Sequence, residues 1–193
     1  MDASQGLPVG EFASQRDWEA WLETEHAASR GLWLRLARKG AGVATVTHDE
    51  ALESALCYGW IDGQARSVDE RFWLLKFTPR GRRSKWSRIN TEKVAELERQ
   101  GRTKPAGLAE VARAREDGRW DAAYEPSSTI SVPDDLQRAL DAEPALSAAF
   151  AGLDRLNRYA ILHRLHDAGK PATRARRLEQ FVAMLREGRR IYP

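Results

Sequence analysis

The sequence predicts an α+β protein: a small antiparallel sheet with packed helices, followed by a C-terminal three- or four-helix bundle. Apolar residues alternate with polar ones in short segments of the first half, but recur every three or four positions toward the end. All seven tryptophans precede residue 121. We therefore expect an α+β domain with a Trp-rich core and a basic loop over residues 1–123, a linker over 124–133 and a helical region over 134–193.

The first domain is expected to begin with a helix and a strand. Ser14 can cap the helix, which should end near Gly31, and alternating leucines over residues 31–39 then predict a strand. Thr47 and Glu50 stand three positions apart, as in a capping box. A second helix is therefore expected to start there.

A β-hairpin and a further helix follow. Residues 60–67 and 72–78 read as strands, and the polar segment 68–71 between them reads as a turn. Asn90 can cap the next helix, which Gly101 would end.

The remaining sequence is helical in character. One helix is expected over residues 106–117. Beyond the linker, whose prolines and small polar residues favour an extended chain, Pro133 opens another helix. Pro144, Leu156 and Thr173 mark three more, which together would form the bundle.

Composition excludes several classes of protein. The chain has 193 residues, with 31 basic against 28 acidic ones, and no run of 18 apolar residues or signal-peptide pattern. We therefore expect a cytoplasmic protein with no membrane association. Its single cysteine, Cys57, rules out an internal disulfide and is expected to be buried and inert. His163 and His166 lack a third ligand, so no metal and no cofactor are expected.

The predicted hairpin has a polar face. Alternation places four residues of its first strand on that face, Trp60, Asp62, Gln64 and Arg66. Phe72, Leu74 and Lys76 would lie across from them, with Asp62 opposite Lys76. This face either lines a polar cleft or is simply solvated, as one side of an antiparallel sheet often is.

A basic segment follows the hairpin. It contains six cations and no acid, namely Lys76, Arg80, Arg82, Arg83, Lys85 and Arg88. Ser84, Ser87 and Asn90 could add hydrogen-bond donors to a bound anion, and Trp86 could stack on a planar ligand or a base. The other interpretation is a solvated, charged surface. A second basic run, on the last helix, is best explained as the outer side of a docked helix.

Several separated motifs resemble the YdeI/OmpD-associated (bacteriocin-protection) family. They are Ala55–Gly63, Phe77–Arg80, Ser84–Asn90, Gly101–Leu108, Ala172–Leu178 and Met184–Gly188. The resemblance implies a bacterial cytoplasmic protein linked to antimicrobial (bacteriocin or antibiotic) tolerance. It brings no reaction or catalytic residue.

Three hypotheses remain open. The first is binding of an anionic or planar aromatic small molecule between the hairpin and the basic loop, by Trp60, Asp62, Gln64, Arg66, Lys76, Arg80, Ser84, Trp86, Ser87 and Asn90. The second is single-stranded nucleic-acid binding through the Lys76–Arg88 basic loop. The third is a hydrolase-type enzyme that uses Asp62 as acid or base.

Overall fold

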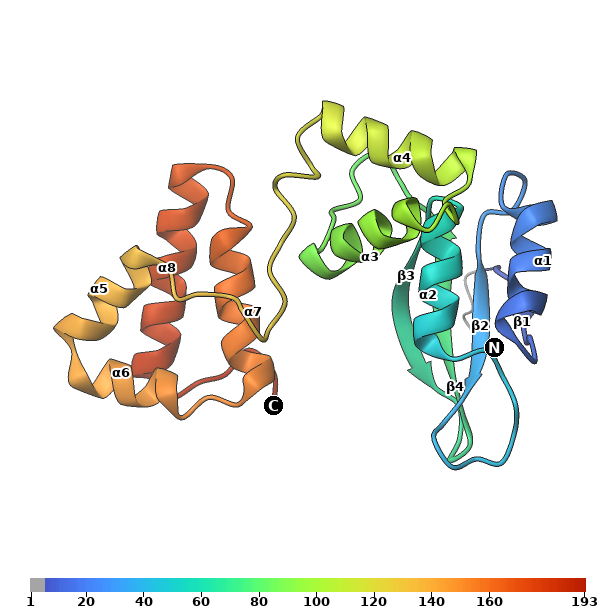
Figure 1. Cartoon of the computed structure of the whole chain (residues 1–193). Coiled ribbons are helices and arrows are strands. Elements are labelled where there is room, and N and C mark those ends of the chain that lie inside the picture. Colours follow the sequence, from blue (N-terminus) through green and yellow to red (C-terminus); the bar gives the residue numbers. More distant parts are fainter. Residues whose placement is uncertain (1–5) are drawn as a thin grey trace. The chain divides into compact units, whose positions relative to one another are not determined.

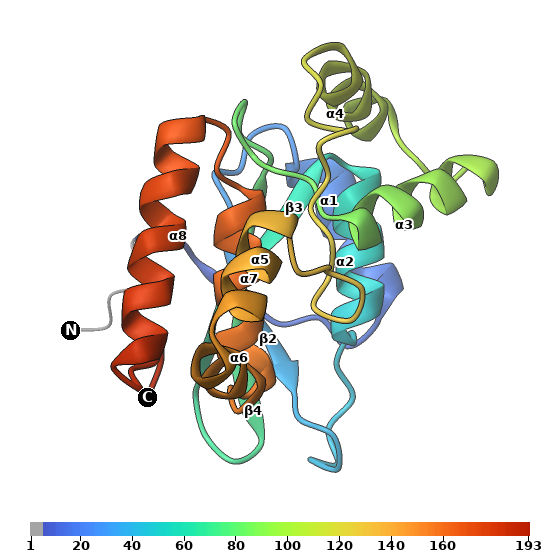
Figure 2. The same cartoon turned by 90° about the vertical axis from the view of Figure 1, so that its left-hand side faces the viewer.

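The computed structural model describes residues 6–193 (Figures 1 and 2) and divides into two compact units. The N-terminal unit consists of the described residues up to Trp86 together with Asn90–Ala122, and the C-terminal unit of Ser87–Ile89 together with Ala123–Pro193. The elements in chain order are β1 (Val9–Gly10), α1 (Gln15–Glu25), β2 (Leu32–Ala37), α2 (His48–Cys57), β3 (Trp60–Ser67), β4 (Phe72–Pro79), α3 (Arg88–Arg99), α4 (Pro105–Glu116), α5 (Asp134–Ala142), α6 (Pro144–Ala151), α7 (Arg155–His166) and α8 (Pro171–Arg186). The predicted α+β class is confirmed.

The sheet has four strands in the order β1-β2-β4-β3. Both pairings of β4 are antiparallel, as predicted, but β1 pairs with β2 in parallel, which makes the sheet mixed. β1 has only two residues and therefore leaves no alternation in the sequence to detect. The backbone N–H of Trp33 extends this pairing by donating to the carbonyl oxygen of Pro8 at 2.8 Å.

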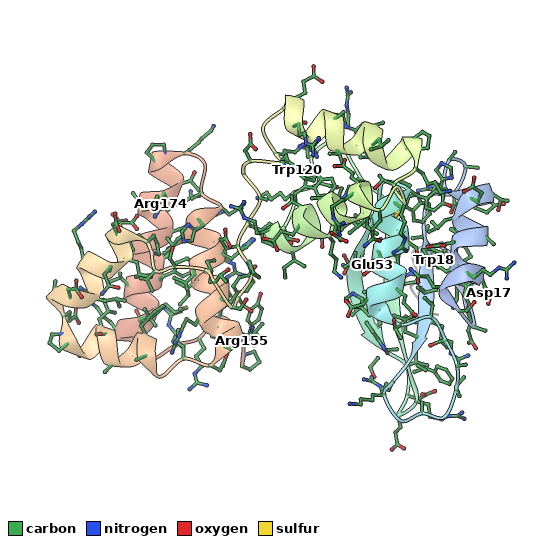
Figure 3. The ribbon with its side chains drawn as sticks, viewed as in Figure 1. Asp17, Trp18, Glu53, Trp120, Arg155 and Arg174 are labelled. Carbon is green, nitrogen blue, oxygen red and sulfur yellow. The ribbon has the colours of Figure 1, made fainter. Side chains whose placement is uncertain are left out.

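Helices α1 and α2 cover one face of the sheet. Leu34 lies opposite Leu75, and both side chains are buried on that face. Trp18 of α1, labelled in Figure 3, packs on Phe77 with 5.6 Å between ring centroids, and its indole N–H donates to the carbonyl oxygen of Ala51 in α2. The Trp-rich core is therefore an aromatic cluster that joins two helices to the sheet.

A β-bulge interrupts strand β3, so the set of residues predicted for the polar face of the hairpin was wrong. The register shifts between Asp62 and Ala65, so Asp62 pairs with Phe77 rather than with Lys76. Because opposite residues share a face, Asp62 lies on the side that α1 and α2 cover. Beyond the bulge, Arg66 pairs with Leu74 on the other side. The extra residue, placed next to a glycine, reverses the alternation.

The helix boundaries confirm most of the expected caps. Ser14 caps α1, and Thr47 with Glu50 forms a complete capping box at α2. Two boundaries were wrong. α1 ends at Glu25, where backbone bonds from residues 28 and 29 to its carbonyl oxygen form a tight turn, well before Gly31. α3 begins at Arg88, so Asn90 lies inside the helix rather than capping it.

The C-terminal unit is a four-helix arrangement of α5 to α8. Its core is formed by Leu136, Leu140, Leu146, Phe150, Leu153, Ile161, Leu162, Leu165, Phe181, Met184 and Leu185. Pro144 opens α6 as expected, and α7 and α8 begin one and two residues before Leu156 and Thr173. No helix within residues 6–193 combines the length and the apolar character that a membrane crossing requires.

Candidate functional site

The two tryptophans predicted to stack on a ligand are buried in this structure. Trp60 is 1% exposed, contacts Trp18 and Trp21 edge-on, and donates its indole N–H to the carbonyl oxygen of His26. Trp86 is 2% exposed and packs on Trp120 with 5.0 Å between ring centroids. Both rings are therefore occupied by contacts within the protein.

Arg80 is the buried anchor of the basic loop. Its guanidinium lies 3.4 Å from the centroid of the Trp86 ring and donates to the carbonyl oxygen of Lys85. Ser84 accepts a hydrogen bond from the backbone N–H of Gly81, and its own carbonyl oxygen accepts one from Arg119. These bonds close residues 81–85 into a fixed loop.

The remaining residues of the predicted site are dispersed. Ser87 and Asn90 are buried, whereas Gln64 is exposed and Lys76 is half-buried. Arg66 lies over the ring of Trp33, at 4.3 Å from its centroid. Arg82, Arg83, Lys85 and Arg88 are exposed, and Arg88 forms an ion pair with Glu125. The loop thus presents cations that phosphate groups could contact, but its tryptophan is not open to a base.

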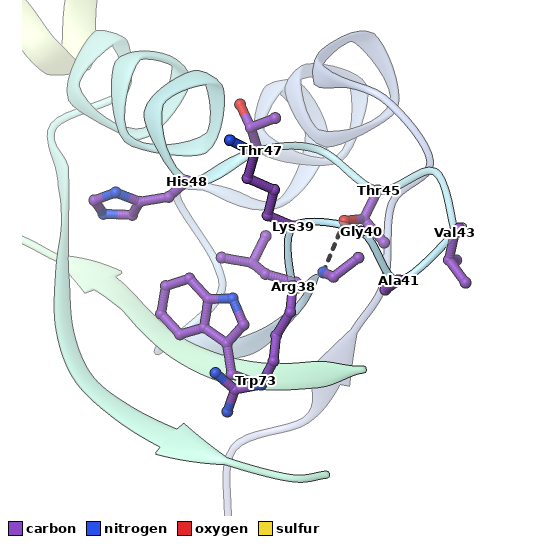
Figure 4. A pocket seen from close by; sticks show the side chains of 12 residues that line it. Arg38, Lys39, Gly40, Ala41, Val43, Thr45, Thr47, His48 and Trp73 are labelled. Carbon is purple, nitrogen blue, oxygen red and sulfur yellow. Dashed lines mark hydrogen bonds between the residues drawn. The ribbon is translucent and has the colours of Figure 1, made fainter. Parts of the chain in front are cut away.

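A pocket of about 520 Å³ lies in the N-terminal unit beside the hairpin turn (Figure 4). We call it the Trp73 pocket. It is lined by Leu36, Ala37, Arg38, Lys39, Gly40, Ala41, Gly42, Val43, Thr45, Thr47, His48 and Trp73. These residues come from the end of β2, the β2–α2 loop, the start of α2 and strand β4. No acidic residue is among the described residues that line it.

Two glycines and three hydrogen bonds set the conformation of the β2–α2 loop, which lines the pocket. Gly40 and Gly42 have φ values of +85° and +68°, a backbone region that side chains disfavour. Arg38 fixes the start of the loop to the hairpin, donating to the Ser67 hydroxyl and to the carbonyl oxygen of Asp69. Thr45 fixes its end, because its hydroxyl accepts the backbone N–H of Ala37 at 2.9 Å (Figure 4).

His48 and Asp62 form a pair at the edge of this pocket. Nε2 of His48 lies 3.4 Å from Oδ2 of Asp62, and the side chains are 43% and 29% exposed. The hydrogen bond to Asp62 raises the pKa of His48 above its ordinary value. The imidazole also faces Trp73, at 6.1 Å between ring centroids. Asp62 is thus the one residue of the predicted site that reaches this region, through His48.

Sequence reasoning missed His48 and Trp73. His48 falls at the start of the helix expected from the Thr47–Glu50 capping box, and Trp73 falls in the strand expected over residues 72–78. A signal was present: Gly40 and Gly42 sit between a basic strand end and a capping box, which indicates an open loop ahead of a helix. What could not be seen was the bulge that turns Asp62 toward α2.

Cys57, His163 and His166, which the sequence analysis also considered, have structural surroundings in this fold. Burial raises the pKa of the Cys57 thiol to about 11, so the thiol stays protonated at neutral pH. His163 packs between Tyr124 and Tyr159, and His166 bonds to the carbonyl oxygen of Ser131. Among residues 6–193, no group of three histidine, cysteine or acidic side chains is arranged to hold a metal ion.

In the comparison with known proteins, two family models match two successive parts of the chain. Residues 10–110, just over half of the chain, match the model described as a domain of unknown function (DUF8412), and residues 129–188 match the model described as Bacteriocin-protection, YdeI or OmpD-Associated. No curated protein and no solved structure is significantly similar.

The motifs behind the family resemblance divide between these two matches. Ala172–Leu178 and Met184–Gly188 lie inside the second match, and the four earlier motifs lie inside the first. The chain therefore belongs to the DUF8412 family of unknown function, and its residues 129–188 match the model of the YdeI/OmpD-associated family.

Proposed function

We propose that the N-terminal unit binds a planar aromatic small molecule carrying an anionic group, and that the Trp73 pocket is its site. The observation that carries this proposal is the composition of the pocket. An indole ring, two cations and an imidazole surround about 520 Å³, without an acidic lining residue. Aromatic rings stack on indole, and guanidinium and ammonium groups attract anions.

The cations, rather than the start of α2, supply the attraction for the anion. Two backbone N–H groups at the start of α2 are already used, because the Thr47 hydroxyl accepts the N–H of Glu50 and the Glu50 carboxylate accepts the N–H of Thr47. Arg38 is held in place by the hairpin, and Lys39 is exposed beside it. A ligand would therefore meet one fixed and one adaptable cation.

The name of the C-terminal domain, bacteriocin protection, suggests the biological setting. In this proposal the protein contributes to antimicrobial tolerance by sequestering a toxic aromatic compound in the cytoplasm. Sequestration needs a pocket and a sufficient concentration of protein, and it needs no catalytic step.

Calorimetric titration with naphthalene-2-sulfonate tests the pocket, with neutral 2-naphthol as the comparison ligand. The sulfonate should bind more tightly than the naphthol. Lys39→Ala should weaken binding of the sulfonate by about two- to fivefold, as expected for an exposed ion pair, and should leave binding of the naphthol unchanged. Trp73→Ala should weaken both. Lys170→Ala, which changes an exposed lysine of the other unit, is the control. If the unchanged protein and the three variants bind the sulfonate equally, the Trp73 pocket is not its binding site.

A second candidate function is hydrolysis, and the observation that favours it is the His48–Asp62 pair. A carboxylate that holds an imidazole beside a pocket is the arrangement of a general base and its orienting group. Here His48 would take a proton from water, and Asp62 would orient the ring rather than act as the base. His48→Gln and Asp62→Asn should then abolish protection of cells, and Asp62→Asn, which changes no lining residue of the pocket, should leave naphthalene-2-sulfonate binding within about twofold. Full protection by both variants would exclude catalysis and leave binding as the function.

A further inference from the structure

The C-terminal unit contains a groove of about 410 Å³ that the proposed function does not use. It runs between residues 127–132 and helices α6 and α7, and we call it the α6–α7 groove. Its apolar lining residues are Ile130, Val132, Phe150, Leu153 and Leu162. Phe150, Leu153 and Leu162 belong to the buried core of the unit, and Ile130 and Val132 pack against it while half-buried. The floor is therefore a part of the core that is not fully covered.

The outer wall of the groove is held in place by hydrogen bonds. The backbone N–H of Ile130 donates to the carbonyl oxygen of Pro126, which forms a turn. Arg155, in the first turn of α7 and labelled in Figure 3, donates from Nε and Nη2 to the Ser127 hydroxyl, at 3.2 and 2.9 Å. The Tyr159 hydroxyl donates to the carbonyl oxygen of Glu125. A wall fixed in this way keeps the groove open.

Two arginines line the groove and carry its charge. Arg155 and Arg158 are both exposed, and within residues 6–193 neither forms an ion pair with an acidic side chain. Arg158 donates instead to the carbonyl oxygens of Ala151 and Leu153 and lies 5.6 Å from the centroid of Phe150. No acidic residue is among the described lining residues.

The acidic residue nearest to Arg155 in the sequence is Asp154, whose carboxylate already accepts hydrogen bonds from α7. The Asp154 carboxylate accepts the backbone N–H and the side-chain amide of Asn157, and these bonds lower the pKa of Asp154. It therefore acts as the N-terminal cap of α7. The positive charges of Arg155 and Arg158 are therefore available to an anionic ligand.

We propose that the α6–α7 groove binds an amphipathic carboxylate, with its acyl or arylalkyl chain on the apolar floor and its carboxylate between Arg155 and Arg158. Burial of an apolar chain on the floor is favourable because it removes apolar surface from water. Guanidinium groups can donate paired hydrogen bonds to a carboxylate. The site lies wholly within one unit and is independent of the Trp73 pocket.

Titration of the full chain with octanoate, followed by backbone NMR shifts, tests the proposal. Octanoate should shift the amide signals of Ile130 and Val132 and bind about three- to tenfold more tightly than 1-octanol, because only the carboxylate meets the arginines. Arg158→Gln should remove most of that advantage and leave 1-octanol unaffected. Val132→Trp, which fills the groove, should weaken both probes.

Two controls make the outcome decisive. Arg176→Gln removes an exposed arginine of α8 outside the groove and should leave octanoate binding unchanged. Trp73→Ala should also leave it unchanged, which separates this site from the proposed aromatic site. The proposal is overturned if octanoate and 1-octanol bind equally, if Arg158→Gln and Arg176→Gln behave alike, or if the shifts fall outside residues 127–162.

Discussion

Histidine 48 owes its electrostatic character to a residue on a neighbouring strand. The hydrogen bond that its imidazole donates to Asp62 is the largest cause of its raised pKa, ahead of the opposing effect of burial. Asp49 also raises the pKa of His48, and Lys93 lowers it. The protonated imidazole is therefore more favourable in the folded state than in the unfolded one.

We expect Asp62→Asn to destabilise the protein at acidic pH and to have little effect at alkaline pH. A raised folded-state pKa contributes stability that is fully present below the unfolded value, about 6.5, and is lost as pH rises through the folded value. The expected loss at the acidic end is about 0.5–1 kcal/mol, because both side chains are partly exposed. Urea unfolding across this range measures it. Asp121→Asn, an exposed carboxylate of the same unit, is the control, and a loss independent of pH would contradict the assignment.

At the scale of elements, helix α4 packs unusually close to the end of α2. A Cβ atom on Gly107 would lie 2.3 Å from the carbonyl oxygen of Cys57. The same carbonyl oxygen accepts the backbone N–H of Lys104 at 3.0 Å, just before α4 begins. Gly107 is therefore required by packing and not by its own helix.

Gly107→Ala should destabilise the protein, although alanine is normally the better helix former. Helix propensity alone would stabilise by about 1 kcal/mol, whereas a clash with fixed backbone typically costs about 1–3 kcal/mol. We expect a net loss in urea unfolding. Ala112→Gly, at an exposed position of α4, provides the comparison and should cost about 1 kcal/mol. A stabilising Gly107→Ala would show that α4 is free to move away from α2.

The basic loop depends on a buried aromatic contact rather than on its charges. Trp86 contacts both Arg80 and Trp120, and Arg115 lies over the ring of Trp120, at 4.9 Å from its centroid. Most of the stabilisation should therefore come from the buried indole.

Trp86→Ala should cost about 3–5 kcal/mol of unfolding free energy, as is typical of a large aromatic residue removed from a core. Arg83→Ala should change it by less than about 0.5 kcal/mol, because Arg83 is exposed. Equilibrium urea unfolding of the two variants decides the point. Similar small losses would mean that the loop is held by other contacts.

At the scale of the whole molecule, the chain carries two separate hydrophobic cores. All seven tryptophans belong to the N-terminal unit, whereas the core of the C-terminal unit is aliphatic apart from two phenylalanines. Tryptophan fluorescence therefore reports the unfolding of one unit, and far-UV circular dichroism reports that of both.

Leu165→Ala should separate these two signals. Leu165 is fully buried in the C-terminal core, and its truncation should cost that unit about 2–5 kcal/mol. The circular dichroism transition should then begin at lower urea while the fluorescence midpoint stays in place. Leu75→Ala, in the core of the N-terminal unit, should move the fluorescence midpoint instead. Coincident transitions in both variants would show a single cooperative molecule.

Much of this architecture was predictable because its signals are local. Ser14 and the Thr47–Glu50 capping box identify helix starts from residues three positions apart, and the hairpin follows from two apolar strands around a polar turn. The candidate site was predicted less well. Trp60 and Trp86 were assigned to a ligand because their residue type suits stacking, but burial depends on what lies across from a ring.

By itself, the sequence determined the described elements other than β1, their order, the change from a tryptophan-rich to an aliphatic core and the concentration of cations after the hairpin. Each of these depends on residues close together in the chain. Only the tertiary structure decided that Asp62 turns toward His48, that Trp73 faces an open loop and that Arg155 and Arg158 line one groove. These arrangements depend on a single bulge and on packing between distant elements, and a shift of one residue reverses which side chains meet.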